Sequence, residues 1–82
     1  MPSDFISPGQ YYRHFKGNIY KVIGIALHTE TNEQLVIYQA QYGSFNLFAR
    51  PISMFHEEID PQKYPNAKQK FRFELIDEKN IR

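Results

Sequence analysis

The sequence contains no cysteine. This absence excludes disulfide bonds, thiolate metal ligands and cysteine nucleophiles. A chain of 82 residues has room for a single hydrophobic core, and that core must hold together without covalent cross-links. Such a composition suits a reducing compartment, so the sequence predicts a cytoplasmic location.

Long apolar runs are also missing. The longest, Val22–Leu27, is far shorter than the roughly 20 residues that a membrane-spanning helix needs. The N-terminus lacks the basic start and apolar stretch of a signal peptide. The net charge is only +1, so the molecule as a whole is not steered toward polyanions. We therefore expect a soluble protein with no membrane partner.

Hydrophobic and aromatic residues are present in quantity, at 41% and 16% of the chain. This content is enough for a packed core and argues against disorder, which needs low hydrophobicity and high net charge. The charges are unevenly placed. Cations without acids occupy the stretches between Phe5 and Thr29 and between Pro61 and Phe73, and small acidic groups lie between these stretches.

Runs rich in β-branched and aromatic residues predict short antiparallel strands joined by turns. Two strands would meet at the glycine-containing turn Lys16–Asn18. The remaining strands are expected at residues 19–28, 34–42, 45–50 and 71–76. Pro51 suits the start of a short helix, because apolar residues recur at helical spacing after it.

These elements favour an SH3-like small antiparallel β-barrel with one short helical turn. Closure into a barrel would remove exposed strand edges. The domain would span residues 9–76, with a flexible lead-in at 1–8 and a frayed tail at 77–82. Gly24, inside an otherwise bulky strand, predicts a sharp bend or a β-bulge.

Strand register decides which face carries Arg50. A two-residue turn at Gly43–Ser44 would place Tyr38 opposite Ala49 and would put Arg50 on the other face, near Ile37. A slip of one residue exchanges the two faces, so the sequence alone leaves the face of Arg50 open.

Five short motifs stand out along the chain: Tyr12–Gly17, His28–Thr31, Tyr42–Gly43, Phe48–Pro51 and Met54–Phe55. They resemble the motifs of a bacterial domain-of-unknown-function family, family 1653. The resemblance covers about residues 9–60 and, more weakly, the terminal phenylalanine strand. Phe48 stands where the family usually has tryptophan, so the ring is kept but the indole N–H donor is lost. The resemblance implies a small, mostly β protein of bacterial or phage origin, and it implies no activity because the family's activity is unassigned.

The leading functional hypothesis is a non-catalytic module that binds a small anionic or nucleotide-like ligand, or a short peptide. Aromatic side chains would supply contact area and arginines would supply complementary charge. His28, close to Glu30 in sequence, could bind an anion near neutral pH. The candidate ligand-binding residues are Tyr12, Arg13, His14, His28, Glu30, Thr31, Tyr42, Phe48 and Arg50.

Several of these residues also have a structural alternative. His28 could cap one end of the barrel while Thr31 bonds to the backbone of its turn. Arg13 could lie over a tyrosine ring, and Arg50 could be buried against an acid such as Glu57.

Two other functions stay open. Lys63, Lys68, Lys70 and Arg72, with the rings between them, could bind RNA or single-stranded DNA, although the same segment equally fits a solvated loop. A small enzyme with His28 and Glu30 as an acid–base pair is disfavoured, because so short a chain encloses little volume and shows no nucleophile or cofactor loop.

Neither a metal nor a cofactor is expected. The three histidines match no standard ligand spacing, and no glycine-rich phosphate loop is present. The protein is expected to be a monomer or a weak homodimer, in which the strand at residues 71–76 would offer an exposed edge.

Overall fold

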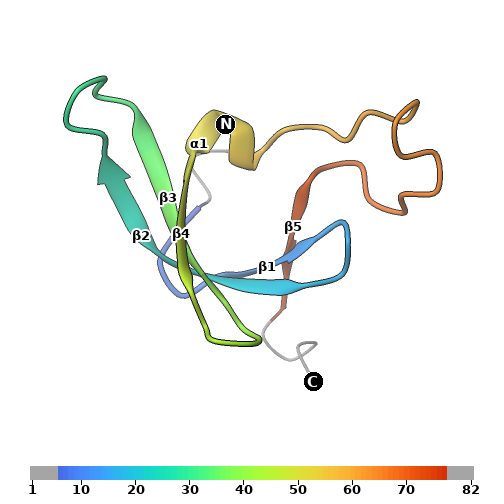
Figure 1. The fold of residues 1–82 in the computed structure, drawn as a ribbon, viewed down its shortest axis with the longest axis horizontal. Coiled ribbons are helices and arrows are strands. Elements are labelled where there is room, and N and C mark those ends of the chain that lie inside the picture. The colour runs from blue at the N-terminus through green and yellow to red at the C-terminus, as the bar shows by residue number, and fades with distance from the viewer. Residues whose placement is uncertain (1–5, 78–82) are drawn as a thin grey trace.

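The computed structural model describes residues 6–77, which form one antiparallel sheet and one short helix (Figure 1). The sheet has five strands in the order β4-β3-β2-β1-β5. The mostly β, antiparallel fold with a single short helix is therefore as predicted. The elements are β1 (Tyr11–His14), β2 (Ile19–Leu27), β3 (Gln34–Ala40), β4 (Leu47–Pro51), α1 (Ile52–Phe55) and β5 (Phe73–Ile76).

The sheet is strongly bent but open. Strands β4 and β5 are its two edges, and no backbone pairing joins them within residues 6–77. Figure 1 shows β2 running through the whole bend, from the β1–β2 turn to the β2–β3 hairpin. The closed SH3-like barrel thus stays a prediction.

A β-bulge accompanies the bend in β2. Val22 pairs with Tyr38, whereas Gly24 pairs with Ile37, so Ile23 is an extra residue on β2. Because side chains alternate along a strand, this extra residue moves every later side chain of β2 to the opposite face. The predicted bend or bulge at Gly24 is confirmed.

The loop between β3 and β4 is longer than expected. The backbone N–H of Ala40 donates to the carbonyl of Asn46 at 3.0 Å, so the loop comprises residues 41–46. Gly43 and Phe45 both have left-handed backbone conformations, with φ of 59° and 56°. The predicted two-residue turn at Gly43–Ser44 is therefore wrong.

The longer loop changes the register of β4. Tyr38 lies opposite Phe48 rather than Ala49, and Arg50 lies opposite Val36. The prediction that Arg50 falls on the other face, near Ile37, is wrong for this reason. Arg50 projects from the same face as the buried Val36 and Tyr38.

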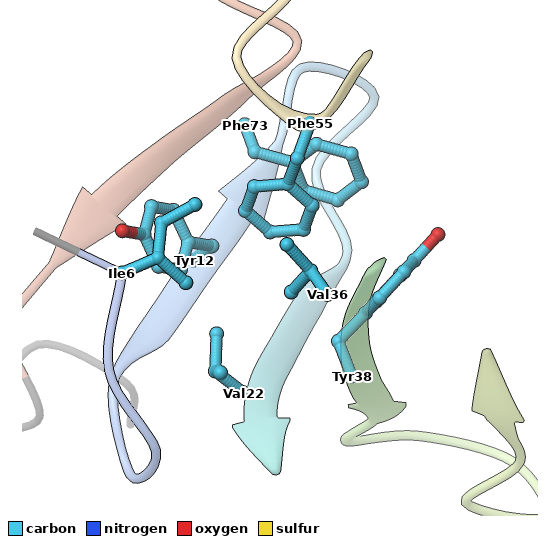
Figure 2. Packing of buried hydrophobic residues seen from close by; sticks show 7 residues of the cluster. All are labelled: Ile6, Tyr12, Val22, Val36, Tyr38, Phe55 and Phe73. Atoms are coloured by element: carbon cyan, nitrogen blue, oxygen red, sulfur yellow. The ribbon is translucent and has the colours of Figure 1, made fainter. Parts of the chain in front are cut away.

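The core lies on this face and is covered by α1 (Figure 2). Phe55 of α1 stacks on Phe73 of β5, with ring centroids 4.3 Å apart and planes 6° apart. Phe55 is fully buried, which contributes about 1.5–3 kcal/mol relative to an exposed side chain. The core cluster consists of Ile6, Tyr12, Val22, Val36, Tyr38, Phe55 and Phe73.

The chain ends bear on the domain boundaries. Ile6 is buried in the core, although it falls within the predicted flexible lead-in at residues 1–8. The predictions for residues 1–5 and 78–82 concern positions outside the residues that the structure describes.

Candidate functional site

One end of the core face carries a set of rings around a single arginine. Tyr20 of β2 is central to this set, with its ring centroid 5.3 Å from that of Tyr38 and 5.7 Å from that of Tyr42. The register brings these residues together, because β1, β2 and β3 are neighbouring strands and Phe48 lies opposite Tyr38. We call this set the arginine–aromatic cluster; its members are His14, Tyr20, Tyr38, Tyr42, Phe48, Arg50 and Phe73.

Arg50 is half-buried in this cluster and is held from two sides. Its Nε donates a hydrogen bond to Tyr38 Oη at 3.3 Å, and its guanidinium carbon lies 5.8 Å from the centroid of the Phe73 ring. Figure 2 shows the Tyr38 hydroxyl pointing away from Phe55 and Phe73. No carboxylate among residues 6–77 forms an ion pair with Arg50.

The predicted pairing of Arg50 with Glu57 does not form. Glu57 Oε1 instead accepts a hydrogen bond from Arg72 Nε at 3.0 Å and forms an ion pair with Arg72 Nη2 at 2.9 Å. The two arginines therefore differ, since Arg72 has an acidic partner and Arg50 has none in the described part of the chain. Among residues 6–77, the hydrogen bond of the Arg50 side chain is made by Nε and not by its terminal nitrogens.

His14 is a titratable group whose pKa is affected by both arginines. Its pKa is lowered to about 4, first by burial and then by the charges of Arg72, Lys16 and Arg50. Its Nδ1 accepts a hydrogen bond from the Lys16 backbone N–H at 3.1 Å. His14 is thus neutral at neutral pH, mainly because it is partly buried and further because three cations disfavour its protonation.

A hydroxyl pair closes the cluster on the side of the β3–β4 loop. The hydroxyl oxygens of Tyr20 and Tyr42 are 2.7 Å apart. Burial, followed by this hydrogen bond to Tyr42, raises the pKa of Tyr20 to about 12. Both Tyr20 and His14 therefore keep one protonation state around neutral pH.

The cluster is accessible to solvent through its outer rings. Tyr42 and Phe48 are 42% and 41% exposed, which is high for large rings beside a core. Exposed rings next to an arginine that has no acidic partner among residues 6–77 can offer a planar ligand apolar contact area and an anionic ligand a charge partner.

The structure brings together only some of the predicted ligand-binding residues. His14, Tyr42, Phe48 and Arg50 belong to the cluster. Tyr12 is buried in the core, where its hydroxyl donates to Gln10 Oε1 at 3.2 Å. Arg13 alternates with Tyr12 and His14 along β1 and so projects from the opposite face of the sheet.

The predicted residues of the β2–β3 hairpin lie elsewhere. His28, Glu30 and Thr31 occupy its tip, at the opposite end of β3 from Tyr42 (Figure 1). Their hydrogen bonds are local: His28 Nδ1 accepts from the Glu30 backbone N–H at 3.2 Å, and Thr31 Oγ1 accepts from the Glu33 backbone N–H at 3.2 Å. The contact between His28 and Glu30 does not involve the carboxylate that acid–base chemistry would use.

The basic segment is divided by its contacts. Lys63 lies over the ring of Tyr64, Arg72 over that of Phe15 and Lys70 over that of Phe71. Lys68 lines another open groove with Arg13.

Within residues 6–77 no group of three or more acidic or histidine side chains is arranged to hold a metal ion. The same part of the chain has no helix long and apolar enough to cross a membrane.

Sequence-based reasoning did not nominate the centre of the cluster. Tyr20, Tyr38 and Phe73 lie in predicted strands but are not among the predicted ligand-binding residues. The available signal was alternation, because Tyr20 is in phase with Val22 and Tyr38 is in phase with Val36.

The chain is thus a small antiparallel β protein with an arginine–aromatic cluster at one end of its core. It belongs to the DUF1653 family, a family of unknown function whose model matches residues 10–75. The crystal structure of a DUF1653 protein from Bordetella bronchiseptica is similar, with 29% sequence identity and a TM-score of 0.73 over 90% of this chain and 91% of that chain. No curated protein matches the chain. The predicted family membership is confirmed.

Proposed function

We propose that this protein is a non-catalytic module that binds an anionic, nucleotide-like ligand, and that Arg50 is its anion-binding residue. The observation that carries this proposal is the half-buried Arg50 guanidinium, held by Tyr38 and Phe73 without an acidic partner among residues 6–77. A partly desolvated charge without a partner is unfavourable, so an incoming anion gains the interaction that the fold leaves unmade. The planar fork of arginine suits a phosphate or a carboxylate.

The surroundings of Arg50 support the same ligand class. Lys16 and Arg72 act on His14 together with Arg50, so positive potential is concentrated around this end of the sheet. The exposed rings of Tyr42 and Phe48 provide area on which a base or another planar group can stack. An anion joined to a planar ring would use both features.

The charge states of the cluster favour binding over catalysis. A general acid or base works best with a pKa near the operating pH. His14, with a pKa of about 4, and Tyr20, with a pKa of about 12, both lie far from neutrality.

We also infer that the sheet is of the SH3-like type. Support comes from the meander of β1 to β4, the return of β5 to pair with β1, and the short helix α1 before the final strand. The bulge in β2 supplies the bend that such a small barrel needs.

The test is an NMR titration of the ¹⁵N-labelled protein with AMP, inorganic phosphate and adenosine. We expect AMP to shift the amide signals of residues 48–50 and to bind more tightly than adenosine or phosphate. Arg50→Met should weaken AMP binding by about 10- to 150-fold, since a hydrogen bond to a charged group contributes about 1.5–3 kcal/mol.

Arg13→Met is the matched control, because it removes the same charge from the opposite face of the sheet. It should leave the affinity for AMP unchanged. Equal losses in the two variants, or no loss in Arg50→Met, would reject Arg50 as the anion-binding residue.

A further inference from the structure

A second surface lies beside the cluster, where the loop before β5 meets the β1–β2 turn. The two segments lie on the same side of the molecule in Figure 1 and enclose an open groove of about 350 Å³. This volume falls at the small end of the range for ligand sites and is sufficient for one nucleobase. We call it the Phe15–Tyr64 groove; it is lined by Phe15, Lys16, Lys63, Tyr64, Pro65, Asn66 and Ala67.

Rings and cations alternate along this groove. The rings of Phe15 and Tyr64 meet edge to face, with centroids 4.8 Å apart. Lys16 Nζ lies 5.8 Å from the Phe15 centroid and 6.0 Å from the Tyr64 centroid, and Lys63 Nζ lies 5.7 Å from the Tyr64 centroid. The guanidinium of Arg72 lies 5.8 Å from the Phe15 centroid. Each ring is therefore flanked by positive charge.

The two lysines of the groove are not neutralised by acids in the described part of the chain. No salt bridge within residues 6–77 involves Lys16 or Lys63. The nearby Asp60 carboxylate accepts from the Gln62 backbone N–H at 2.9 Å, and Glu57 is paired with Arg72. Lys16 and Lys63 are both exposed, so they can meet phosphates at the mouth of the groove.

The geometry points to single-stranded nucleic acid as the ligand of the Phe15–Tyr64 groove. A single strand presents unstacked bases to aromatic rings and phosphates to cations in regular alternation. A duplex would hide its bases and could use only the cations. This inference does not depend on anion binding by Arg50, because the groove has its own rings and lysines.

A path also connects the two surfaces. The ring of His14 lies 4.6 Å from that of Phe15 and 5.0 Å from that of Phe73, over which Arg50 lies. A strand with one base at Tyr64 can therefore extend along the His14 side toward Arg50. The Arg50 site would then add one further phosphate contact.

The experiment is fluorescence anisotropy with a labelled ten-nucleotide oligouridylate, the matching oligothymidylate and a ten-base-pair duplex, at 50 to 300 mM salt. We expect the single strands to bind more tightly than the duplex. With two lysine–phosphate contacts, the logarithm of the binding constant should fall by about 1.4 per tenfold increase in salt, and Lys63→Gln should reduce that slope by about 0.7.

The ring contribution is tested with a matched pair of variants at Tyr64. Tyr64→Leu keeps an apolar side chain against Phe15 but removes the stacking ring, and it should weaken binding by about 5- to 150-fold. Tyr64→Phe keeps the ring and should bind as the wild type does. The ¹⁵N spectrum of each variant reports whether the loop remains folded. The Lys63→Gln variant changes an exposed side chain, so it tests the groove without disturbing its packing.

Several outcomes overturn the inference. They are the absence of oligonucleotide binding at 50 mM salt, duplex binding equal to that of single strands, and equal affinity in Tyr64→Leu and Tyr64→Phe. Loss of oligonucleotide binding in Arg50→Met with full binding in Tyr64→Leu would place the nucleic acid at the cluster instead. Failure of AMP binding at Arg50 rejects the proposed function alone, provided that the Tyr64 and Lys63 variants behave as expected.

Discussion

The guanidinium of Arg50 lies over the ring of Phe73, 5.8 Å from its centroid, and this contact joins the two edge strands of the sheet. Arg50 belongs to β4 and Phe73 to β5, which share no backbone pairing within residues 6–77. Tyr38 also reaches Phe73, with ring centroids 5.6 Å apart. The bent sheet is thus bridged by side chains where its backbone is open.

This arrangement explains why charge and aromatic rings gather at one place. Arg50 bridges the two edges of the bent sheet at a half-buried position, beside the exposed rings of Tyr42 and Phe48, so solvent is near. An apolar residue could fill that position, but arginine fills it while keeping its terminal nitrogens accessible. The same residue therefore contributes to packing and to the proposed ligand site.

Phe55 should be the most costly residue to truncate. It is fully buried, stacks on Phe73 and meets Tyr38 with ring centroids 5.4 Å apart. Phe55→Ala should lower the free energy of unfolding by about 3–5 kcal/mol, a large share of the total for a small domain. Chemical denaturation with urea measures this loss.

Met54 provides the control for this prediction. It precedes Phe55 in α1 but is 44% exposed. Met54→Ala should change the free energy of unfolding by no more than about 0.5 kcal/mol. Similar losses of unfolding free energy in both variants would show that stability depends on α1 as a helix and not on burial of the Phe55 ring.

His14 should make stability depend on pH. Its pKa in the folded protein is about 4, against 6.5 for an unperturbed histidine. Between these values the unfolded chain binds more protons than the folded one, so stability should fall as the pH is lowered from about 6.5 to about 4. Below about 4 His14 is protonated in both states, and its contribution no longer changes with pH.

An NMR titration of the His14 ring tests the cause of this shift. Arg72→Gln removes the charge that opposes protonation most strongly, and it also frees the Glu57 carboxylate, so the pKa of His14 should rise. Lys21→Gln removes a cation that contacts Tyr11 and projects from the opposite face, so it should leave the pKa unchanged. An unchanged pKa in Arg72→Gln would exclude the charge of Arg72 as a cause of the shift and would leave burial, Lys16 and Arg50.

Much of the fold was predictable because its signals are local. Runs of β-branched residues indicated the strands, and Gly24 indicated the bulge. Pro51 indicated the boundary at which β4 ends and α1 begins. The resemblance to the DUF1653 family rested on short motifs in those same segments. Closure of the sheet depends on contacts between distant strands, and strand patterns alone do not determine it.

The candidate site was predicted only in part, because its assembly depends on register. The sequence nominated His14, Tyr42, Phe48 and Arg50 but joined them to the distant His28. One assumption about the β3–β4 loop was enough to misplace the face of Arg50. Phe15 and Lys16 of the groove were missed as partners of the basic segment, because they are far from Tyr64 in sequence and meet it only in the folded chain.

The β3–β4 loop should be stabilised by a change at Phe45. This residue has a φ of 56°, which is unfavourable for any side chain with a Cβ atom, and it is 50% exposed. A left-handed conformation costs roughly 1–2 kcal/mol for such a residue, and glycine avoids that cost. Phe45→Gly should therefore be more stable than Phe45→Ala by about 1 kcal/mol, whatever both variants lose in ring contacts.

Comparison of the two variants in urea isolates the backbone term, because both remove the ring and only alanine keeps a Cβ atom. The opposite order would mean that the added freedom of glycine in the unfolded chain outweighs the strain in the loop. The same pair bears on function, since the strained loop holds Tyr42 against Tyr20. If the strain serves to position that ring, Phe45→Gly should bind AMP more weakly than Phe45→Ala even though it is the more stable protein.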